Sequence, residues 1–302
     1  MNEVLEASSS FIQGIHSVSG LPWAASIPLT ALIVRMTVAM PLQMYTKIQA
    51  RKEQDLAPLL TSWSQHYRKE IKSQVNDSSN NPLLVGSAVA QLGKKLTAKK
   101  SSLHRSWGVH RFWKPVNFLQ MPVWIAIMES LRAMSGNNRG LVPYLLSLLE
   151  PNSTGPVPSH LAVEPSFATE GALWFPDLLA GDPTGILPLV LTASILVNIR
   201  TGWKVTTFKE MADLPRSQLA RMGMGRALRL LLQALALNIG ISSYLYEMPV
   251  ALLIYWTTST NVATVQSFIL ERYMFKRPAL KPRKKLYVGL KSENGASAQR
   301  HL

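Results

Sequence analysis

The sequence predicts an all-α membrane protein with five transmembrane helices around a hydrophilic groove and an amphipathic helical hairpin on one side of the membrane. Three observations lead to this fold class. Of the 302 residues, 47% are hydrophobic and only 16% are charged. The hydrophobic residues are concentrated in long blocks, and the basic residues lie almost entirely between particular blocks. This organisation is typical of polytopic membrane proteins.

Five apolar blocks approach the length of about 20 residues that a helix needs to cross the hydrocarbon core. The second block is interrupted by Lys114, Glu129 and Arg132, and the fourth begins beside Arg226 and Arg229. These two are therefore the least regular of the predicted spans. The five spans are predicted at residues 24–44, 112–134, 178–199, 227–245 and 249–270.

The net charge of +15 is distributed unevenly along the chain. Of the 32 Lys and Arg residues, 28 lie in three segments, residues 45–111, 200–229 and 271–302. Basic residues gather on the inner side of a membrane, and short loops obey this rule best. The N-terminus is therefore predicted outside and the C-terminus inside, where inside means cytosol or an organelle matrix.

The first span carries one charge, Arg35, near its middle. An arginine at mid-bilayer costs about 2.5 to 3.5 kcal/mol on insertion scales, so it normally faces protein or a water-filled cavity. The sequence therefore predicts a hydrated groove with Arg35 on its wall. In the alternative interpretation, Arg35 reaches the membrane interface or forms an internal salt bridge without a functional role.

Three domains are predicted along the chain. Residues 1–20 have an uneven apolar face and are expected to form an amphipathic segment on the outer side. Residues 21–270 form the five-span core, including an outer loop at 135–173. Residues 271–302 form a basic tail on the inner side.

The long inner loop, residues 45–111, is predicted to be an amphipathic helical hairpin. Apolar residues recur at steps of three or four from Leu56 to Val75 and again from Val85 to Leu96, on either side of a breaker run. Such a hairpin either only caps the bundle or has a function, which would be to recruit a chain or to gate a groove. Amphipathicity indicates burial and does not distinguish these two roles.

No catalytic, metal or cofactor site is predicted, and the protein is not expected to be an enzyme. The chain has no cysteine, and its six histidines lack metal-ligand spacing. A channel or transporter that binds an anion at Arg35 is an alternative, but it predicts internal repeats, which the two halves do not show. A structural subunit of a respiratory complex is another. The basic runs could also contact RNA, although anionic lipid explains them first.

Several motifs, in order, resemble the YidC/oxidase-assembly/Alb-type family of membrane insertases. They are the first span with its central arginine and final proline, the inner hairpin, NFLQMPV, LWFPDLLAGDPTGILPL and ALLIYWTTSTNVATVQSFIL. The resemblance extends over about residues 18–270. Within the family, the LWFPDL sequence and the N-terminal EVLEASSSFIQGIHSVSGLPW are most similar to the mitochondrial branch devoted to cytochrome c oxidase assembly.

The resemblance also implies which residues line a client-binding groove. The arginine of the family's first span matches Arg35, and the aromatic residue of its last span matches Trp256, with Tyr255 beside it. On the third span, Thr192 and Asn198 are both candidates for the polar position. In the second span, Gln120 and Met121 are expected to contact the client.

The implied function is insertion or translocation in the mitochondrial inner membrane, with the N-terminus in the intermembrane space and the C-terminus in the matrix. The client would be a hydrophilic tail of a cytochrome c oxidase subunit, the second subunit being the usual client of this branch. Implied partners are nascent membrane proteins, anionic lipid at the matrix face and a weak mitoribosome contact through the basic tail, without nucleotide. A general co-translational insertase is the alternative, and an anion channel or transporter is a more distant one.

Overall fold

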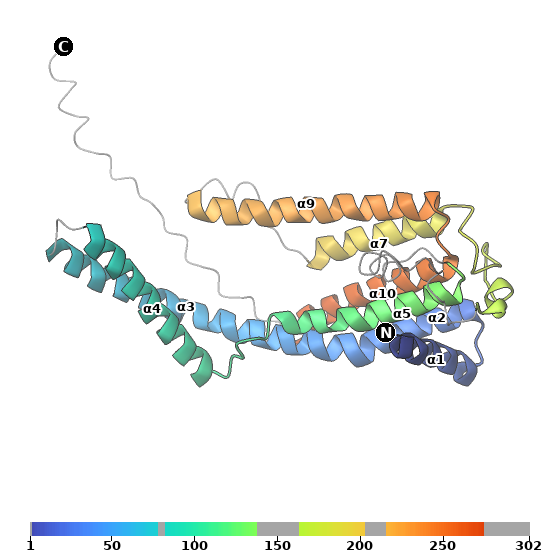
Figure 1. Cartoon of the computed structure of the whole chain (residues 1–302), viewed down its shortest axis with the longest axis horizontal. Coiled ribbons are helices and arrows are strands. Elements are labelled where there is room, and N and C mark those ends of the chain that lie inside the picture. Colours follow the sequence, from blue (N-terminus) through green and yellow to red (C-terminus); the bar gives the residue numbers. More distant parts are fainter. Residues whose placement is uncertain (1, 78–81, 138–162, 203–215, 275–302) are drawn as a thin grey trace, which may run out of the picture. The chain divides into compact units, whose positions relative to one another are not determined.

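The computed structural model describes residues 2–77, 82–137, 163–202 and 216–274 (Figure 1). The regular secondary structure of these residues is helical, besides two isolated β-bridges, Ala172 with Phe175 and Gly181 with Pro249. The predicted all-α fold class is therefore confirmed. The chain divides into two compact units, which are described separately. Unit 1 is Met1–Ile48 with Phe112–Lys276, and unit 2 is Gln49–Arg111 with Arg277–Leu302.

Unit 1 begins with the helix α1 (Asn2–Ser19), where the sequence predicted an amphipathic segment. Its apolar face includes the fully buried Ile12, and it packs against α2 and α5. The chain turns at Gly20, whose φ of +63° is a conformation that glycine adopts without steric cost. The next helical run contains α2 (Trp23–Val34), the π-helical turn η1 (Arg35–Ala39) and the start of α3 (Met40–Asp77).

The helix α10 contacts α2, α5 and α7 in unit 1. Its first residues, VALLIY, are apolar on every side and are all buried, so α10 forms the centre of the core. The helix α9 packs against α7, beside which it lies in Figure 1. The bounds are η2 (Pro115–Leu119), α5 (Gln120–Met134), η3 (Pro165–Ala168), α7 (Ile186–Gly202), α9 (Arg216–Leu245), α10 (Val250–Ile269) and η4 (Leu270–Met274).

Two helices begin later than the predicted spans. The second span was expected from residue 112, but α5 starts at Gln120 after the 3-10 turn η2, which has Pro115 at its first position. The third span was expected from residue 178, but α7 starts at Ile186 because Pro183 and Gly185 come first, with Gly185 at a φ of +70°. Proline and glycine in a left-handed conformation both interrupt a regular helix.

Four carboxylates lie in unit 1 near the helix termini where α2 and α7 begin and α5 ends: Glu129, Glu164, Glu170 and Asp182. We call this group the acidic end. Glu170 accepts a hydrogen bond from the backbone N–H of Trp23 at 3.0 Å. The Trp23 indole in turn donates to Ser166 at 2.7 Å, and Ser166 donates to Glu164 at 2.8 Å. These bonds connect the start of α2 to the segment around η3.

Asp182, just before the start of α7, accepts backbone hydrogen bonds at the beginning of this helix. Its carboxylate accepts the N–H of Leu187 at 2.7 Å and both the N–H and the hydroxyl of Thr184, at 3.0 and 2.6 Å. Burial opposes ionisation of Asp182, but these hydrogen bonds outweigh that effect, so the pKa of Asp182 lies below its ordinary value.

Unit 2 contains the continuation of α3 and the helix α4 (Pro82–Ser106), which lie side by side in opposite directions (Figure 1). Glu70 pairs with Lys95 at 2.8 Å and Glu53 pairs with Lys100 at 3.8 Å, so one helix rises in number as the other falls. The Lys99 ammonium lies 4.2 Å from the centre of the Trp63 ring. The hydrogen bond from Lys95 lowers the pKa of Glu70, which is an exposed group.

By length and composition, two described helical runs are able to cross a membrane, Trp23–Glu70 and Gly223–Leu245. Ile186–Gly202 is apolar but shorter. The prediction of five spans, and of an inner-side position for the hairpin, stays a prediction.

Candidate functional site

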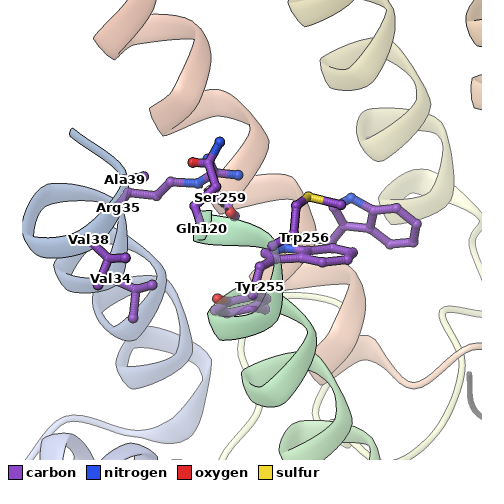
Figure 2. Close-up of a pocket in the computed structure, with 10 residues that line it drawn as sticks. Val34, Arg35, Val38, Ala39, Gln120, Tyr255, Trp256 and Ser259 are labelled. Carbon is purple, nitrogen blue, oxygen red and sulfur yellow. Dashed lines mark hydrogen bonds between the residues drawn. The ribbon is translucent and has the colours of Figure 1, made fainter. Parts of the chain in front are cut away.

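A pocket of about 210 Å³ opens in unit 1 among α2 with η1, α5 and α10 (Figure 2). Three helices that are distant in sequence supply its walls, and most of its lining is apolar. It is lined by Val34, Arg35, Val38, Ala39, Gln120, Met121, Trp124, Tyr255, Trp256 and Ser259.

Arg35 is the charged residue of this lining, and it begins the π-helical turn η1. A π-turn holds one residue more than an α-turn and leaves local backbone groups in need of partners, and such turns are frequent at functional sites. Here the carbonyl oxygen of Arg35 accepts the N–H of Met40 and the side-chain amide of Gln266, the latter at 2.9 Å. Gln266 on α10 is only 4% exposed, so the backbone at Arg35 is tied to the core.

The Arg35 guanidinium has a neutral partner. Its Nε donates to the Ser259 hydroxyl at 2.8 Å, a contact between η1 and α10 that is seen in Figure 2. In the part of the chain that the structure describes, no carboxylate forms an ion pair with Arg35. A cation held away from bulk water without an opposite charge is unfavourable, so the pocket has an electrostatic preference for an anionic group.

Aromatic side chains form the opposite wall of the pocket. Tyr255 is almost completely buried, and Trp256 on α10 meets Trp124 on α5 edge to face, with 5.8 Å between ring centres and 63° between ring planes. Met121, one helical turn before Trp124, is 46% exposed. The pocket therefore combines one cation with a large apolar surface, which suits a polypeptide segment that carries an acidic residue among apolar ones.

The structure brings together Arg35, Gln120, Met121, Tyr255 and Trp256, which were all predicted from the sequence as site residues. Their arrangement around one pocket is compatible with the predicted groove, while their role in client binding stays a prediction. The Gln120 side-chain oxygen is buried and accepts no hydrogen bond in the described structure, so this wall also offers an acceptor.

The two third-span candidates, Thr192 and Asn198, do not line this pocket. Thr192 is buried, donates to the carbonyl of Pro188 at 2.8 Å and faces Gly240 of α9 so closely that any Cβ there would collide with it. Asn198 donates to the Thr264 hydroxyl of α10 at 2.8 Å. Both residues therefore join α7 to its neighbours in this structure.

Sequence reasoning did not single out Trp124 and Ser259, although both line the pocket. Helical spacing could have found them. Trp124 comes four residues after Gln120, and Ser259 comes four residues after Tyr255, so each lies on the same helix face as a predicted residue.

Comparison with known proteins identifies the family. The family model described as 60Kd inner membrane protein matches residues 98–277, which is more than half of the chain. The chain belongs to this family. It is the YidC/oxidase-assembly family that the motifs resemble, so that resemblance is confirmed.

Curated relatives match most of the chain. A protein of Pongo abelii named "Cytochrome c oxidase assembly protein COX18, mitochondrial" is 26% identical over 91% of this chain and 75% of its own length. The protein of that name in Schizosaccharomyces pombe is 23% identical over 86% of this chain and 97% of its own length. "Mitochondrial inner membrane protein OXA1" of Saccharomyces cerevisiae is 24% identical over 63% of this chain and 37% of its own length. The similarity to the oxidase-assembly proteins thus extends further along the chain than the similarity to this last protein.

Proposed function

We propose that this protein is an insertase of the mitochondrial inner membrane that moves a hydrophilic tail of a cytochrome c oxidase subunit from the matrix to the intermembrane space. The observation that carries the proposal is Arg35, a cation whose side-chain partner among the described residues is a hydroxyl, in a pocket walled by Trp124, Tyr255 and Trp256. Family membership and the names of the relatives support the compartment and the process. The proposed client is the second oxidase subunit.

The proposed membrane arrangement has five spans, with the N-terminus in the intermembrane space and the C-terminus in the matrix. In chain order, the first span runs from Trp23 to residue 44, and the second is α5 with its preceding turn. The third is α7, the fourth is residues 227–245 and the last is α10. The excess of Lys and Arg at residues 45–111, 200–229 and 271–302 supports this orientation. The domains then follow as an outer segment at 1–20, a core at 21–270 with an intermembrane-space loop at 135–173, and a basic tail at 271–302.

In this arrangement the pocket shortens the apolar distance that a hydrophilic tail must cross. Arg35 attracts an acidic residue of the passing tail, and the attraction replaces hydration that the acid loses on entering the membrane. A membrane potential positive on the outside favours the outward movement of negative charge by about 2.3 kcal/mol per charge per 100 mV. The mechanism therefore requires neither nucleotide nor cofactor, and no covalent chemistry is proposed.

The apolar part of the client leaves by a different wall. Gln120 and Met121 on α5 lie beside Trp124, and Met121 is exposed, so a client helix can contact this face before it enters lipid. Thr192 and Asn198 are proposed to hold the third span in place, and either becomes a groove residue if α7 moves during transport. The hairpin of α3 and α4 would lie on the matrix side, where its lysines meet anionic lipid.

A general co-translational insertase is the second candidate function. The match to the yeast OXA1 protein over 63% of the chain favours it, and the basic tail would then contact the mitoribosome. An anion channel or transporter would use the same Arg35, but it is less favoured because the sequence halves show no repeat.

Photocrosslinking from the pocket to newly made mitochondrial proteins tests the proposal. A photoreactive residue replaces Trp256 or Met121 in the full chain, in mitochondria that translate their own proteins, and Val197, exposed on α7 at 52%, is the control site. We expect adducts with the second oxidase subunit from the two pocket sites and none from position 197. Adducts with many nascent proteins would favour the general insertase. Absence of any client adduct, together with an anion flux lost in Arg35→Ala, would favour the channel and contradict the proposal.

A further inference from the structure

Two side chains of α10 hold Arg35 at different points. The Ser259 hydroxyl accepts a hydrogen bond from the guanidinium Nε at 2.8 Å. The Gln266 amide donates to the backbone carbonyl of Arg35 at 2.9 Å. Ser259 and Gln266 are close to two helical turns apart, so both lie on the face of α10 that meets η1. The helix α10 therefore holds the backbone of Arg35 separately from its side chain.

The buried amide of Gln266 has partners for its nitrogen only. Besides the Arg35 carbonyl, Nε2 lies 3.3 Å from the Met36 sulfur, so both partners of this nitrogen belong to η1. The oxygen Oε1 is buried and accepts no hydrogen bond in the described part of the chain. A buried acceptor without a donor destabilises a fold, and an apolar side chain of similar size would avoid this cost. Packing alone therefore does not explain an amide at this position, whereas its bond to η1 does.

The bond from Gln266 acts on a carbonyl that defines the π-helical turn. In an α-helix the Arg35 carbonyl would accept the N–H of Ala39, four residues later, but here it accepts the N–H of Met40. The wider π-turn is rare in proteins. A second donor on the same carbonyl, supplied by α10, stabilises this turn against the regular helix. A return to α geometry would rotate Arg35 by about 100° relative to the residues that follow η1.

The residues that follow η1 are themselves attached to α10 and the turn after it. Lys47 of α3 donates to the carbonyl of Ser267 at 3.4 Å and pairs with Glu271 of η4 at 3.8 Å. These contacts hold the beginning of α3 in place. Loss of the π-turn would therefore turn the Arg35 side chain away from its present direction instead of rotating α3.

We propose that Gln266 is a positioning residue, which holds η1 in its π geometry and thereby keeps the Arg35 guanidinium directed into the pocket. This inference rests on the proposed function, in which the guanidinium meets an acidic residue of the client. The client carboxylate can replace Ser259 as the partner of the guanidinium, whereas the bond from Gln266 involves only the backbone and persists. Gln266 is not part of the pocket lining, so it acts through Arg35.

Export of two client tails by the variant Gln266→Met tests this role. Methionine is similar to glutamine in length but cannot donate a hydrogen bond to the Arg35 carbonyl. One tail keeps its acidic residues, and in the other they are replaced by Asn and Gln. We expect Gln266→Met to export the acidic tail about three- to tenfold less than the native chain does, the factor that corresponds to one hydrogen bond. The neutral tail should be exported equally by the two proteins, because it does not depend on the direction of Arg35.

Thr264→Val is the matched control, because it removes a hydrogen bond between α10 and Asn198 of α7 and leaves η1 untouched. It should export both tails as the native chain does. The melting temperature of Gln266→Met should not fall, since the unpaired oxygen disappears and the Arg35 carbonyl keeps the N–H of Met40. If Gln266→Met does not fold, Gln266→Asn, whose amide is one methylene shorter, decides by the same comparison of the two tails.

Arg35→Ala in the same assay separates the two possible failures. If it lowers export of the acidic tail and Gln266→Met does not, the role of Gln266 is wrong and the proposed function stands. An equal loss of both tails in Gln266→Met, or the same loss in Thr264→Val, would also overturn the role, because a general packing defect explains it. If the native chain exports neither tail, the proposed function is wrong and the positioning role falls with it.

Discussion

Two partly buried arginines of unit 1 differ in the charge of their partners. Arg132, near the end of α5, pairs with Glu129 at 2.6 Å, and its guanidinium also donates to the carbonyl of Asn137. Arg35, in the pocket, has the hydroxyl of Ser259. The first charge is compensated inside the protein, whereas the second is compensated only when something anionic enters. The difference distinguishes an arginine that stabilises the fold from one that is available to a passing chain.

The same difference extends to the surroundings of each arginine. At the acidic end, carboxylates accept hydrogen bonds from the backbone N–H of Trp23, from the Arg132 guanidinium and from the backbone N–H at the start of α7. The pocket has none in its lining. Because buried charges are normally paired, the acidic end is expected to respond to substitution with lost stability, and the pocket with lost transport.

The largest effect is expected from breaking the internal ion pair. Glu129→Ala leaves Arg132, whose side chain is 13% exposed, without its carboxylate, and removal of one partner of a buried pair costs about 3 to 5 kcal/mol. Thermal unfolding of the purified protein in detergent measures the loss. The double variant Glu129→Leu with Arg132→Met should recover most of it, since apolar replacement of both partners is often neutral. If Glu129→Ala were as stable as the native chain, the proposed difference between Arg132 and Arg35 would be wrong.

The second effect concerns transport. Arg35→Ala should lower export of the client tail about ten- to hundredfold, because hydrogen bonds to charged groups contribute about 1.5 to 3 kcal/mol. The melting temperature should stay the same or rise, since a cation without an acidic partner is removed. Protease accessibility of the tail in the intermembrane space measures export, and Arg35→Lys serves as the charge-preserving control. Undiminished export by Arg35→Ala would contradict the proposed role of the arginine.

A third change gives the arginine of the pocket a carboxylate partner, as Arg132 has at the acidic end. Ser259→Asp gives Arg35 a carboxylate at the position of its present hydroxyl partner, 2.8 Å away. Export should fall by up to about tenfold while thermal stability increases, because the internal acid competes with the client for the guanidinium. Ser259→Ala removes the same hydrogen bond without adding a charge and should export nearly as well as the native protein. If the two variants export equally, competition for Arg35 is not what limits transport.

The smallest effect is a pH dependence at Asp182. Its folded pKa lies below the ordinary value of 3.8. Its contribution to stability is therefore complete above pH 3.8 and is lost as the pH falls through the lower folded value. Asp182→Asn should cost about 1 kcal/mol at neutral pH, as for other helix-capping side chains. Melting temperatures of both proteins between pH 7 and pH 3 should converge at the acid end, and a constant difference would mean that the charge is not involved.

The local features of the sequence predicted much of the structure. The helix α1 lies where the amphipathic pattern before residue 20 was found, and the helices α3 and α4 lie on either side of the breaker run. Boundaries were less accurate, since hydropathy alone extends across Pro115 and Pro183, while the backbone cannot continue a regular helix there. Five spans and their orientation remain predictions that crosslinking and protease accessibility can test.

The candidate site was predicted in part, and the two types of miss have different causes. Trp124 and Ser259 lie one helical turn from predicted residues, so a closer use of helical spacing would have included them. Thr192 and Asn198 were selected as polar residues of an apolar span, but polarity does not reveal which neighbour a side chain meets. In the structure they meet α9 and α10, and a place in the groove stays a prediction for both.

By itself, the sequence determined that this chain is helical and that its basic residues lie between apolar blocks. It also determined that the first apolar block contains an arginine near its middle. These properties depend on composition and on neighbours a few residues apart. The tertiary structure decided that Arg35 meets a serine 224 residues later instead of an acid, and that α5 and α10 close the same pocket. Helical periodicity gives the direction of a side chain from its own helix, but its partner depends on how the helices pack.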